Sequence, residues 1–118
     1  MNWQKLSNTE QLEAIKESSN NPDLLGILIF KHSTRCATSA MALYRIEKSW
    51  SLDVAQMPTF FLDILSFRQL SDFISSTFGI PHQSPQALVI KDGLCIYDNS
   101  HMSISTRSIL KSVGLDNM

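Results

Sequence analysis

The 118-residue sequence contains only two cysteines and has no excess of positive charge. Ten lysines and arginines stand against eleven aspartates and glutamates, which gives a formal net charge of −1. Without a basic surplus the chain cannot neutralise a phosphate backbone or an anionic bilayer, so we expect neither nucleic acid nor a membrane as a partner. The length and the 43% hydrophobic content suit a single domain over residues 1–118 with one core.

Long hydrophobic runs are also missing. The longest run, interrupted by one glycine, covers residues 24–30, far short of the ~20 residues needed to cross a bilayer. The first six residues have no apolar stretch of the signal-peptide type, so we expect a cytoplasmic location. In that reducing compartment Cys36 and Cys95 are expected to be thiols and not a disulfide. The three histidines lack the close, paired spacings of zinc ligands, so we predict no metal site.

Hydrophobic periodicity predicts an alternation of helices and strands. The predicted elements are a helix that starts at the capping box Ser7–Glu10, a strand at 24–30, a helix at 36–50, a strand at 59–65, a helix at 67–78, strands at 87–90 and 94–97, and a final helix capped by Ser105. The Asp-Gly pair between the last two strands is typical of an antiparallel hairpin, whereas the earlier alternation requires parallel strands. We therefore predict an α/β, thioredoxin-like fold: a four-stranded mixed sheet with an antiparallel C-terminal hairpin and helices on both faces.

Cys36 lies where a buried strand feeds a helix. Unpaired amides and the positive end of the helix dipole meet at that point and favour a thiolate, and the neighbouring Arg35 adds a positive charge. Ser39, one helical turn further on, is a candidate hydroxyl donor to the sulfur. A serine cannot form a disulfide, so the predicted chemistry is that of a single thiol. The competing interpretation is a small helix residue that happens to be cysteine.

Two segments resemble the signatures of one family. Residues 31–39, with the sequence Lys-His-Ser-Thr-Arg-Cys-Ala-Thr-Ser, resemble the K-H-S-T-x-C-P-I-S signature of the YtxJ-type bacilliredoxins, which are thioredoxin-fold proteins of the bacillithiol system. Residues 82–86 resemble the second signature, H-x-S-P-Q. The resemblance implies a monothiol oxidoreductase in which Cys36 removes bacillithiol, or an analogous small thiol, from S-thiolated client proteins. It implies a small thiol as co-substrate and no tightly bound cofactor.

The resemblance also assigns roles around this cysteine. It assigns the reacting thiol to Cys36, and the positions of Arg35 and Ser39 beside it make them the other predicted catalytic residues. The residues predicted to bind the substrate are Thr34, His82, Ser84, Pro85 and Gln86. Pro85 would be the cis-proline that faces the cysteine, because a cis bond leaves the preceding backbone groups free to bind an extended ligand. Without the family motif an ordinary trans proline is the expectation. Ala37 and Thr38 replace the family's Pro-Ile, which removes a proline that preorganises the first helical turn.

Other interpretations stay open. His32 and His82 could contact the thiolate as cations or shuttle a proton, or they could be ordinary loop histidines. Cys95 is expected to be buried and inert within its strand. A metal or iron–sulfur site at Cys36 would need a further thiolate ligand that the sequence does not offer. The alternative function is a non-catalytic thioredoxin-like module in which the loops around Pro85 bind a partner protein.

Overall fold

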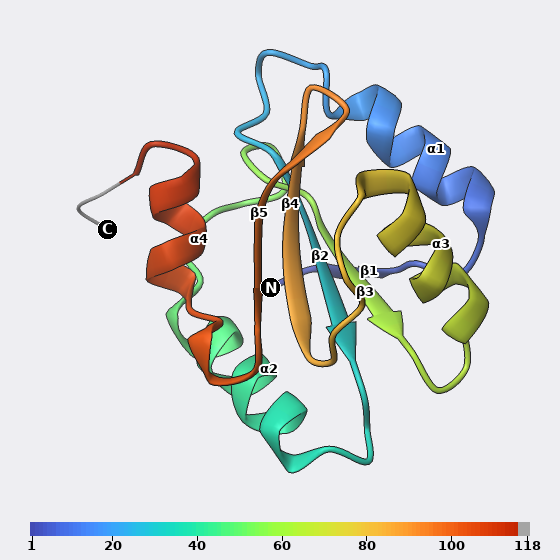
Figure 1. Cartoon of the computed structure of the whole chain (residues 1–118). Helices are drawn as coiled ribbons and strands as arrows, with labels where there is room; N and C mark the ends of the chain where they lie inside the picture. The colour runs from blue at the N-terminus through green and yellow to red at the C-terminus, as the bar shows by residue number, and fades with distance from the viewer. Residues whose placement is uncertain (116–118) are drawn as a thin grey trace.

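A five-stranded mixed sheet forms the centre of the computed structural model, which describes residues 1–115 (Figure 1). The strand order is β1-β3-β2-β4-β5, with β1, β3 and β2 parallel to one another and β4 antiparallel to both β2 and β5. The strands are β1 (Trp3–Lys5), β2 (Ile27–His32), β3 (Thr59–Asp63), β4 (Gln86–Lys91) and β5 (Leu94–Ser100). The helices are α1 (Thr9–Ser18), α2 (Ala37–Ser49), α3 (Arg68–Phe78), the short 3-10 helix η1 (His101–Ser103) and α4 (Thr106–Ser112).

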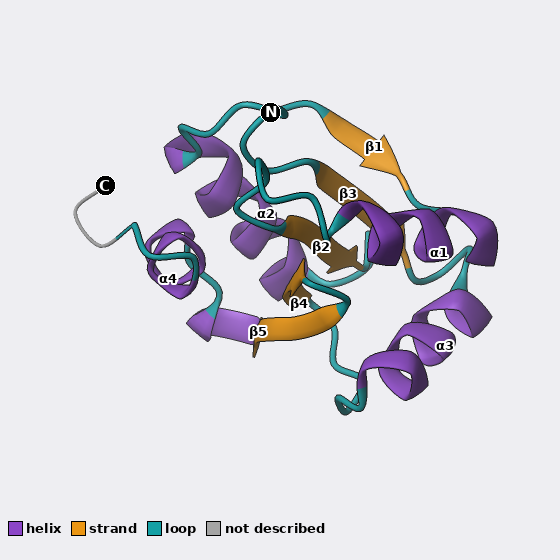
Figure 2. Ribbon diagram, turned by 90° about the horizontal axis from the view of Figure 1, so that it is seen from above, coloured by secondary structure: helices purple, strands orange, loops and turns teal. Residues whose placement is uncertain are grey.

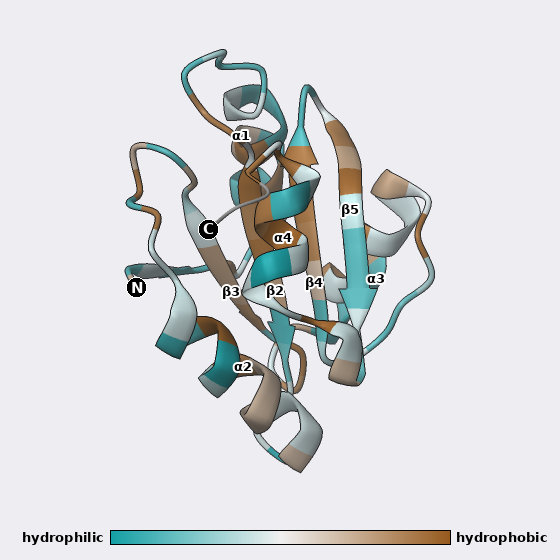
Figure 3. Cartoon of the chain, turned by 90° about the vertical axis from the view of Figure 1, so that its left-hand side faces the viewer, coloured by the Kyte–Doolittle hydropathy of each residue, from teal (hydrophilic) through white to brown (hydrophobic). Residues whose placement is uncertain are grey.

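Helices cover both faces of the sheet, as predicted. Figure 2 shows α1 and α3 on one side of the strands and α2 and α4 on the other. Alternate residues of β2 enter the two halves of the core: Ile27 and Ile29 pack on the α1 and α3 side, whereas Leu28 and Phe30 pack on the α2 and α4 side. Figure 3 shows the apolar residues concentrated on the inner strands, between the helices. The predicted mixed α/β architecture is confirmed.

The predicted number of strands is wrong, because the sheet has five strands and not four. The additional strand is β1, which pairs in parallel with β3 from Trp3 opposite Thr59 to Lys5 opposite Phe61. Three residues that include a glutamine and a lysine are too few to show a hydrophobic period. Tertiary contacts hold the strand instead, since the Trp3 ring lies 6.0 Å from the ring of Phe30 and 5.9 Å from that of Phe61.

Strand β2 begins and ends later than its apolar run suggests. The prediction placed it at 24–30, whereas the strand is Ile27–His32. The first two leucines of the run belong to the preceding loop, where the backbone N–H of Leu25 donates to the carbonyl of Gln56 at 2.9 Å. Lys31 and His32, expected in a polar break, continue the strand and are buried. Their polar groups have partners inside the protein, so polarity alone did not mark the end of the strand.

The predicted turns and caps are mostly correct. Gly79 ends α3 in the left-handed conformation with φ of 69°. The hairpin between β4 and β5 turns at Asp92 and Gly93, which both have positive φ. Ser105 caps α4 by accepting the N–H of Ser108. The cap of α1 is one residue later than predicted: Asn8, not Ser7, accepts a helix N–H.

Candidate active site

Two loops leave the same edge of the sheet. The end of β2 pairs with the start of the antiparallel strand β4, so the segment after β2, residues 33–36 (the Cys36 loop), lies beside the segment before β4, residues 79–85 (the Pro85 loop; Figure 1). The helix η1 joins this edge, because the backbone N–H of His101 donates to the carbonyl of Pro85 at 3.1 Å and η1 contacts α2. The fold therefore brings together two of the segments that the sequence singled out.

Cys36 is the N-cap residue of α2 and has an extended backbone, with φ of −114° and ψ of 117°. Its carbonyl accepts the N–H of Ala40, and its own N–H donates to the carbonyl of Ser33, both at 3.1 Å. The side chain is partly exposed. Within residues 1–115 its thiol has no hydrogen-bond partner, although a side chain at this position commonly accepts the second or third helix amide. The thiol is therefore reachable at the N-cap position of α2.

Ser39 holds the Cys36 loop from within the helix. The side chain is fully buried, and its Oγ accepts the backbone N–H of Ser33 at 3.1 Å. The same Oγ lies 2.6 Å from Nδ1 of His32. We expected Ser39 to donate to the sulfur of Cys36; its hydroxyl instead bonds the residues at the beginning of the loop. Its contacts are those of a group that positions the loop.

His32 is enclosed by aromatic rings on the α2 side of the sheet. Its ring centroid lies 6.1 Å from that of Phe30 and 5.2 Å from that of Phe61. Burial lowers the pKa of His32, and the carboxylates of Asp63 and Glu47 oppose that effect only in part. The neutral imidazole is therefore favoured, which argues against a role for His32 as a cation beside the thiolate.

The residues predicted to contact substrate fall into two groups. Thr34 and Arg35 are exposed on the Cys36 loop, next to the thiol. On the Pro85 loop the peptide bond between Ser84 and Pro85 is cis, and Pro85 is buried. Ser84 is partly buried, and among the described residues its Oγ has no partner. These four residues lie at the edge of the sheet where Cys36 stands.

His82 and Gln86, which were also predicted to bind substrate, face the protein interior instead. Nδ1 of His82 lies 3.0 Å from Oγ of Ser71 on α3. Gln86 is 1% exposed, and its Nε2 donates to the carbonyl of Pro81 at 3.1 Å. Burial lowers the pKa of His82, and the positive charges of Lys31 and Arg68 lower it further while Asp72 opposes them. Through these hydrogen bonds, both side chains connect the Pro85 loop to the rest of the protein on the side away from solvent.

Lys31 is the residue that the sequence analysis missed. Its side chain is fully buried, and Nζ donates to the carbonyl of Ser71 at 3.1 Å and to Oγ of Ser75 at 3.3 Å. Burial lowers the pKa of this amine to about 8. The available signal was its position two residues after Ile29, which places it on the same buried face of β2.

Cys95 has a different environment from Cys36. It lies on β5, partly buried against the core on the α1 and α3 side, and its Sγ donates to the carbonyl of Tyr97 at 3.2 Å. Burial raises the pKa of this thiol to about 11. Cys95 is thus partly and not fully buried, contrary to the prediction, and its raised pKa favours the protonated thiol at neutral pH.

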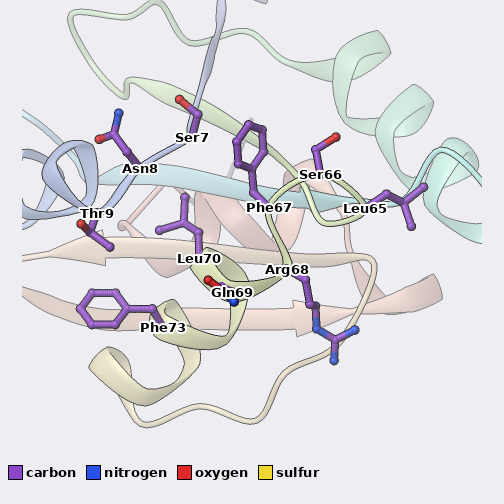
Figure 4. A pocket seen from close by; sticks show the side chains of 10 residues that line it. All are labelled: Ser7, Asn8, Thr9, Leu65, Ser66, Phe67, Arg68, Gln69, Leu70 and Phe73. Carbon is purple, nitrogen blue, oxygen red and sulfur yellow. The ribbon is translucent and has the colours of Figure 1, made fainter.

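A pocket of about 640 Å³ lies between the start of α1 and the connection from β3 to α3 (Figure 4). Ser7, Asn8 and Thr9 form one side, and residues 65–70 with Phe73 form the other. None of the residues predicted from the sequence to act in catalysis or binding lines this pocket. The thiol stands instead at an open edge of the protein.

Residues 1–115 contain no group of three histidine, cysteine, aspartate or glutamate side chains that could hold a metal ion. No helix there is both long and apolar enough to cross a bilayer.

The sheet order, the cysteine that caps α2 and the cis proline at the same edge define a protein of the thioredoxin fold. Solved structures agree. One, described as having a thioredoxin fold and a proposed oxidoreductase role, is 30% identical with a TM-score of 0.76 over 92% of this chain and 90% of that one. A thioredoxin of Malassezia sympodialis is 16% identical, with a TM-score of 0.69 over 95% and 88% of the two chains. A thioredoxin of Fasciola hepatica is 14% identical, with a TM-score of 0.68 over 93% and 95%.

The family is more specific than the fold. Residues 4–109 match the family model described as monothiol bacilliredoxin BrxC. The chain therefore belongs to the monothiol bacilliredoxin family, as the two signatures predicted. Together with the oxidoreductase-like neighbour, this membership supports a thiol redox function.

Proposed function

We propose that this protein is a monothiol thiol–disulfide oxidoreductase that removes a small thiol, bacillithiol or an analogue, from protein mixed disulfides through Cys36. The observation that carries the proposal is the position of the Cys36 sulfur. It is partly exposed, has no hydrogen-bond partner within residues 1–115, and caps α2 at the edge where the Pro85 loop lies. Helix amides at that position stabilise a thiolate, which is the nucleophile in thiol–disulfide exchange.

The reaction consists of two exchanges between sulfurs. In the first, the Cys36 thiolate attacks the small-thiol sulfur of the mixed disulfide, one S–S bond forms as another breaks, and the client leaves as a thiolate. In the second, a small thiol from solution attacks the adduct on Cys36 and releases a small-molecule disulfide and the Cys36 thiolate, while its own proton goes to solvent. Each exchange makes one disulfide for each one broken, so the chain needs no bound redox cofactor.

The absence of a nearby second thiol supports the monothiol route. Ser39, where a dithiol enzyme would have its resolving cysteine, bonds His32 and Ser33. Cys95 packs against the α1 and α3 side of the core, and its pKa of about 11 keeps it protonated. The second exchange therefore falls to a thiol from outside the chain.

The test is intact-mass measurement after incubation of the reduced protein with oxidised bacillithiol, glutathione and coenzyme A. We expect one adduct, mapped to Cys36, with the preferred small thiol identified by the fastest adduct. Removal of the small thiol from a client protein should stop in Cys36→Ser and continue in the matched control Cys95→Ser. An adduct on Cys95, or turnover that persists in Cys36→Ser, would overturn the proposal.

The same protein preparations distinguish catalysis from simple binding. We expect iodoacetamide at pH 6 to 7 to alkylate Cys36 faster than a model thiol, because a catalyst of thiol–disulfide exchange needs a reactive, accessible sulfur. If Cys36 reacts no faster than the model thiol and no adduct forms, the protein is a binding module and the redox proposal fails.

A further inference from the structure

A buried positive charge lies behind the Pro85 loop. Lys31 is fully buried, and Nζ bonds only neutral oxygens, the carbonyl of Ser71 and Oγ of Ser75. No carboxylate lies within 4.0 Å of it in the part of the chain that the structure describes, where the observed ion pair is Arg68 with Asp72. An unpaired buried ammonium group costs free energy, so the hydrogen bonds that Lys31 makes must offset that cost.

A buried acceptor on β4 faces the same side of the sheet. Gln86 directly follows Pro85 and is the register partner of Lys31 across the antiparallel pair, so the two side chains project from the same face with Cβ atoms about 5 Å apart. Its Oε1 is buried and has no partner among the described residues. The ammonium group has three N–H donors, of which two are used. The third donor and the unpaired Oε1 of Gln86 project from the same face of the sheet, where one bridging water could join them.

The other end of the Pro85 loop is joined to the same lysine through α3. The carbonyl of Ser71 accepts from Lys31, while Oγ of Ser71 bonds Nδ1 of His82. The Gln86 amide also reaches back across the loop to the carbonyl of Pro81. Lys31 therefore lies between α3, whose Ser71 bonds His82 of the loop, and Gln86 at the start of β4.

We propose that Lys31 is a positioning residue: its buried ammonium group anchors the Pro85 loop through Ser71 and His82 on one side and through Gln86 on the other. The anchoring concerns the folded chain alone. Its consequence for catalysis, the presentation of Ser84 and Pro85 to a thiolated client, rests on the proposed redox function.

The charge of Lys31 also acts on His82. Burial is the main cause that lowers the pKa of His82, and the positive charge of Lys31 lowers it further, because it disfavours a second cation at the imidazole. The other groups that act on this pair are Arg68 and Asp72 of α3 and Cys95 of β5. The carboxylate of Asp72 is exposed and bonded to Arg68, so it offsets the repulsion only weakly.

The test compares Lys31→Met with Lys91→Met in the full chain. Methionine keeps the length of the side chain and removes the charge. Lys91 is the matched control, because its Nζ donates to the carbonyls of Asn21 and Leu24, both at 2.8 Å, at the opposite end of β4. The readouts are amide hydrogen exchange of the Pro85 loop and an NMR titration of the His82 ring, neither of which requires turnover.

In Lys31→Met we expect exchange of the Ser84 and Gln86 amides to accelerate about tenfold or more, as loss of a charged hydrogen bond predicts. The midpoint of the His82 titration should move to higher pH, because the positive charge that lowers it is gone. Lys91→Met should change neither. Unaltered exchange and an unaltered His82 titration in a folded Lys31→Met protein would overturn the anchoring role.

Reaction rates then show whether the anchor serves the proposed chemistry. Alkylation of Cys36 by iodoacetamide does not need the Pro85 loop and should keep its rate in Lys31→Met. Transfer from a thiolated client should show a KM raised about fivefold or more, since the loop that receives the client is less ordered. If client transfer is unchanged while exchange in the loop is faster, Lys31 anchors the loop, but the anchoring does not contribute to catalysis. If the wild type itself lacks transfer, the proposed function fails and the exchange data still decide the anchor.

Discussion

Oγ of Ser39 lies 2.6 Å from Nδ1 of His32 and at the same time accepts the backbone N–H of Ser33. One buried hydroxyl thus ties the end of β2 and the beginning of the Cys36 loop to the first turn of α2. The serine that stands where a dithiol site would have its second cysteine therefore also fixes the loop that carries Cys36. A serine at this position has a structural task that a smaller residue without a hydroxyl cannot perform.

Removal of that hydroxyl should destabilise the protein. In Ser39→Ala the buried N–H of Ser33 and Nδ1 of His32 lose their shared partner, and we expect the free energy of unfolding to fall by about 1–3 kcal/mol. Urea unfolding measures this change. Ser76→Ala is the matched control, because Ser76 is an exposed serine within α3 whose hydroxyl bonds only a carbonyl of its own helix. Equal effects of the two substitutions would contradict the role assigned to Ser39.

The family's proline should be accepted at position 37. Ala37 is the first residue of α2, where proline loses no helical hydrogen bond, and Cys36 already has the extended φ of −114° that a residue before proline requires. We expect Ala37→Pro to raise the free energy of unfolding by about 0.4–1 kcal/mol. Ala40→Pro should instead lower it by about 3 kcal/mol, because the N–H of Ala40 donates to the carbonyl of Cys36. Thermal unfolding of both variants tests whether α2 begins at Ala37. If Ala37→Pro destabilises the protein, the first residue of α2 is not Ala37.

Lys31 and Cys95 should give the stability of the protein opposite pH dependences. Burial lowers the pKa of Lys31 from 10.5 to about 8, so between these values the unfolded chain binds more protons and the free energy of unfolding rises with pH. Burial raises the pKa of Cys95 from 9.0 to about 11, so above pH 9 the folded chain binds more protons and the free energy of unfolding falls. With both contributions added, the free energy of unfolding rises from about pH 8 to pH 9 and then stays level.

Two variants separate these contributions in urea unfolding measured across that pH range. Lys31→Met should remove the rise and leave only the fall above pH 9, whereas Cys95→Ala should extend the rise to about pH 10.5. A wild-type profile that falls steadily from pH 8 would show that Lys31 is not buried as a charged amine.

Gly26 should not tolerate a side chain. A methyl group built on it would lie 2.7 Å from Cγ1 of Val89, which is fully buried, and 3.4 Å from the carbonyl oxygen of Ile90. We expect Gly26→Ala to lower the free energy of unfolding by about 1–3 kcal/mol through overpacking. In a double-mutant cycle, Val89→Ala should recover part of this loss, and strictly additive effects would argue against the contact.

Much of the fold follows from local patterns in the sequence. The apolar spacing of α3, its stop at Gly79 and the turn at Asp92 and Gly93 were predictable because each depends on a few neighbouring residues. Strand β1 was not predictable, because its stability comes from pairing with β3 and from aromatic contacts of Trp3 that are distant in the sequence.

The candidate site, like the fold, could be predicted from the sequence only in part. The position of Cys36 at the start of a helix followed from the strand and helix around it, whereas the partners of Ser39, His82 and Gln86 depend on side-chain directions in three dimensions. Lys31 was hidden for a different reason. A lysine at the end of an apolar run normally marks the surface, whereas Lys31 is buried and donates hydrogen bonds to acceptors on α3.

The edge strand β1 constrains the order in which the chain can assemble. Trp3 pairs with Thr59, and its ring packs on Phe30 and Phe61, so the first strand has no place to dock until the third strand has been synthesised. During translation β2 and α2 therefore emerge while the leading segment still has no strand to pair with. The leading segment therefore stays without its strand partner at least until residues 59–63 are available.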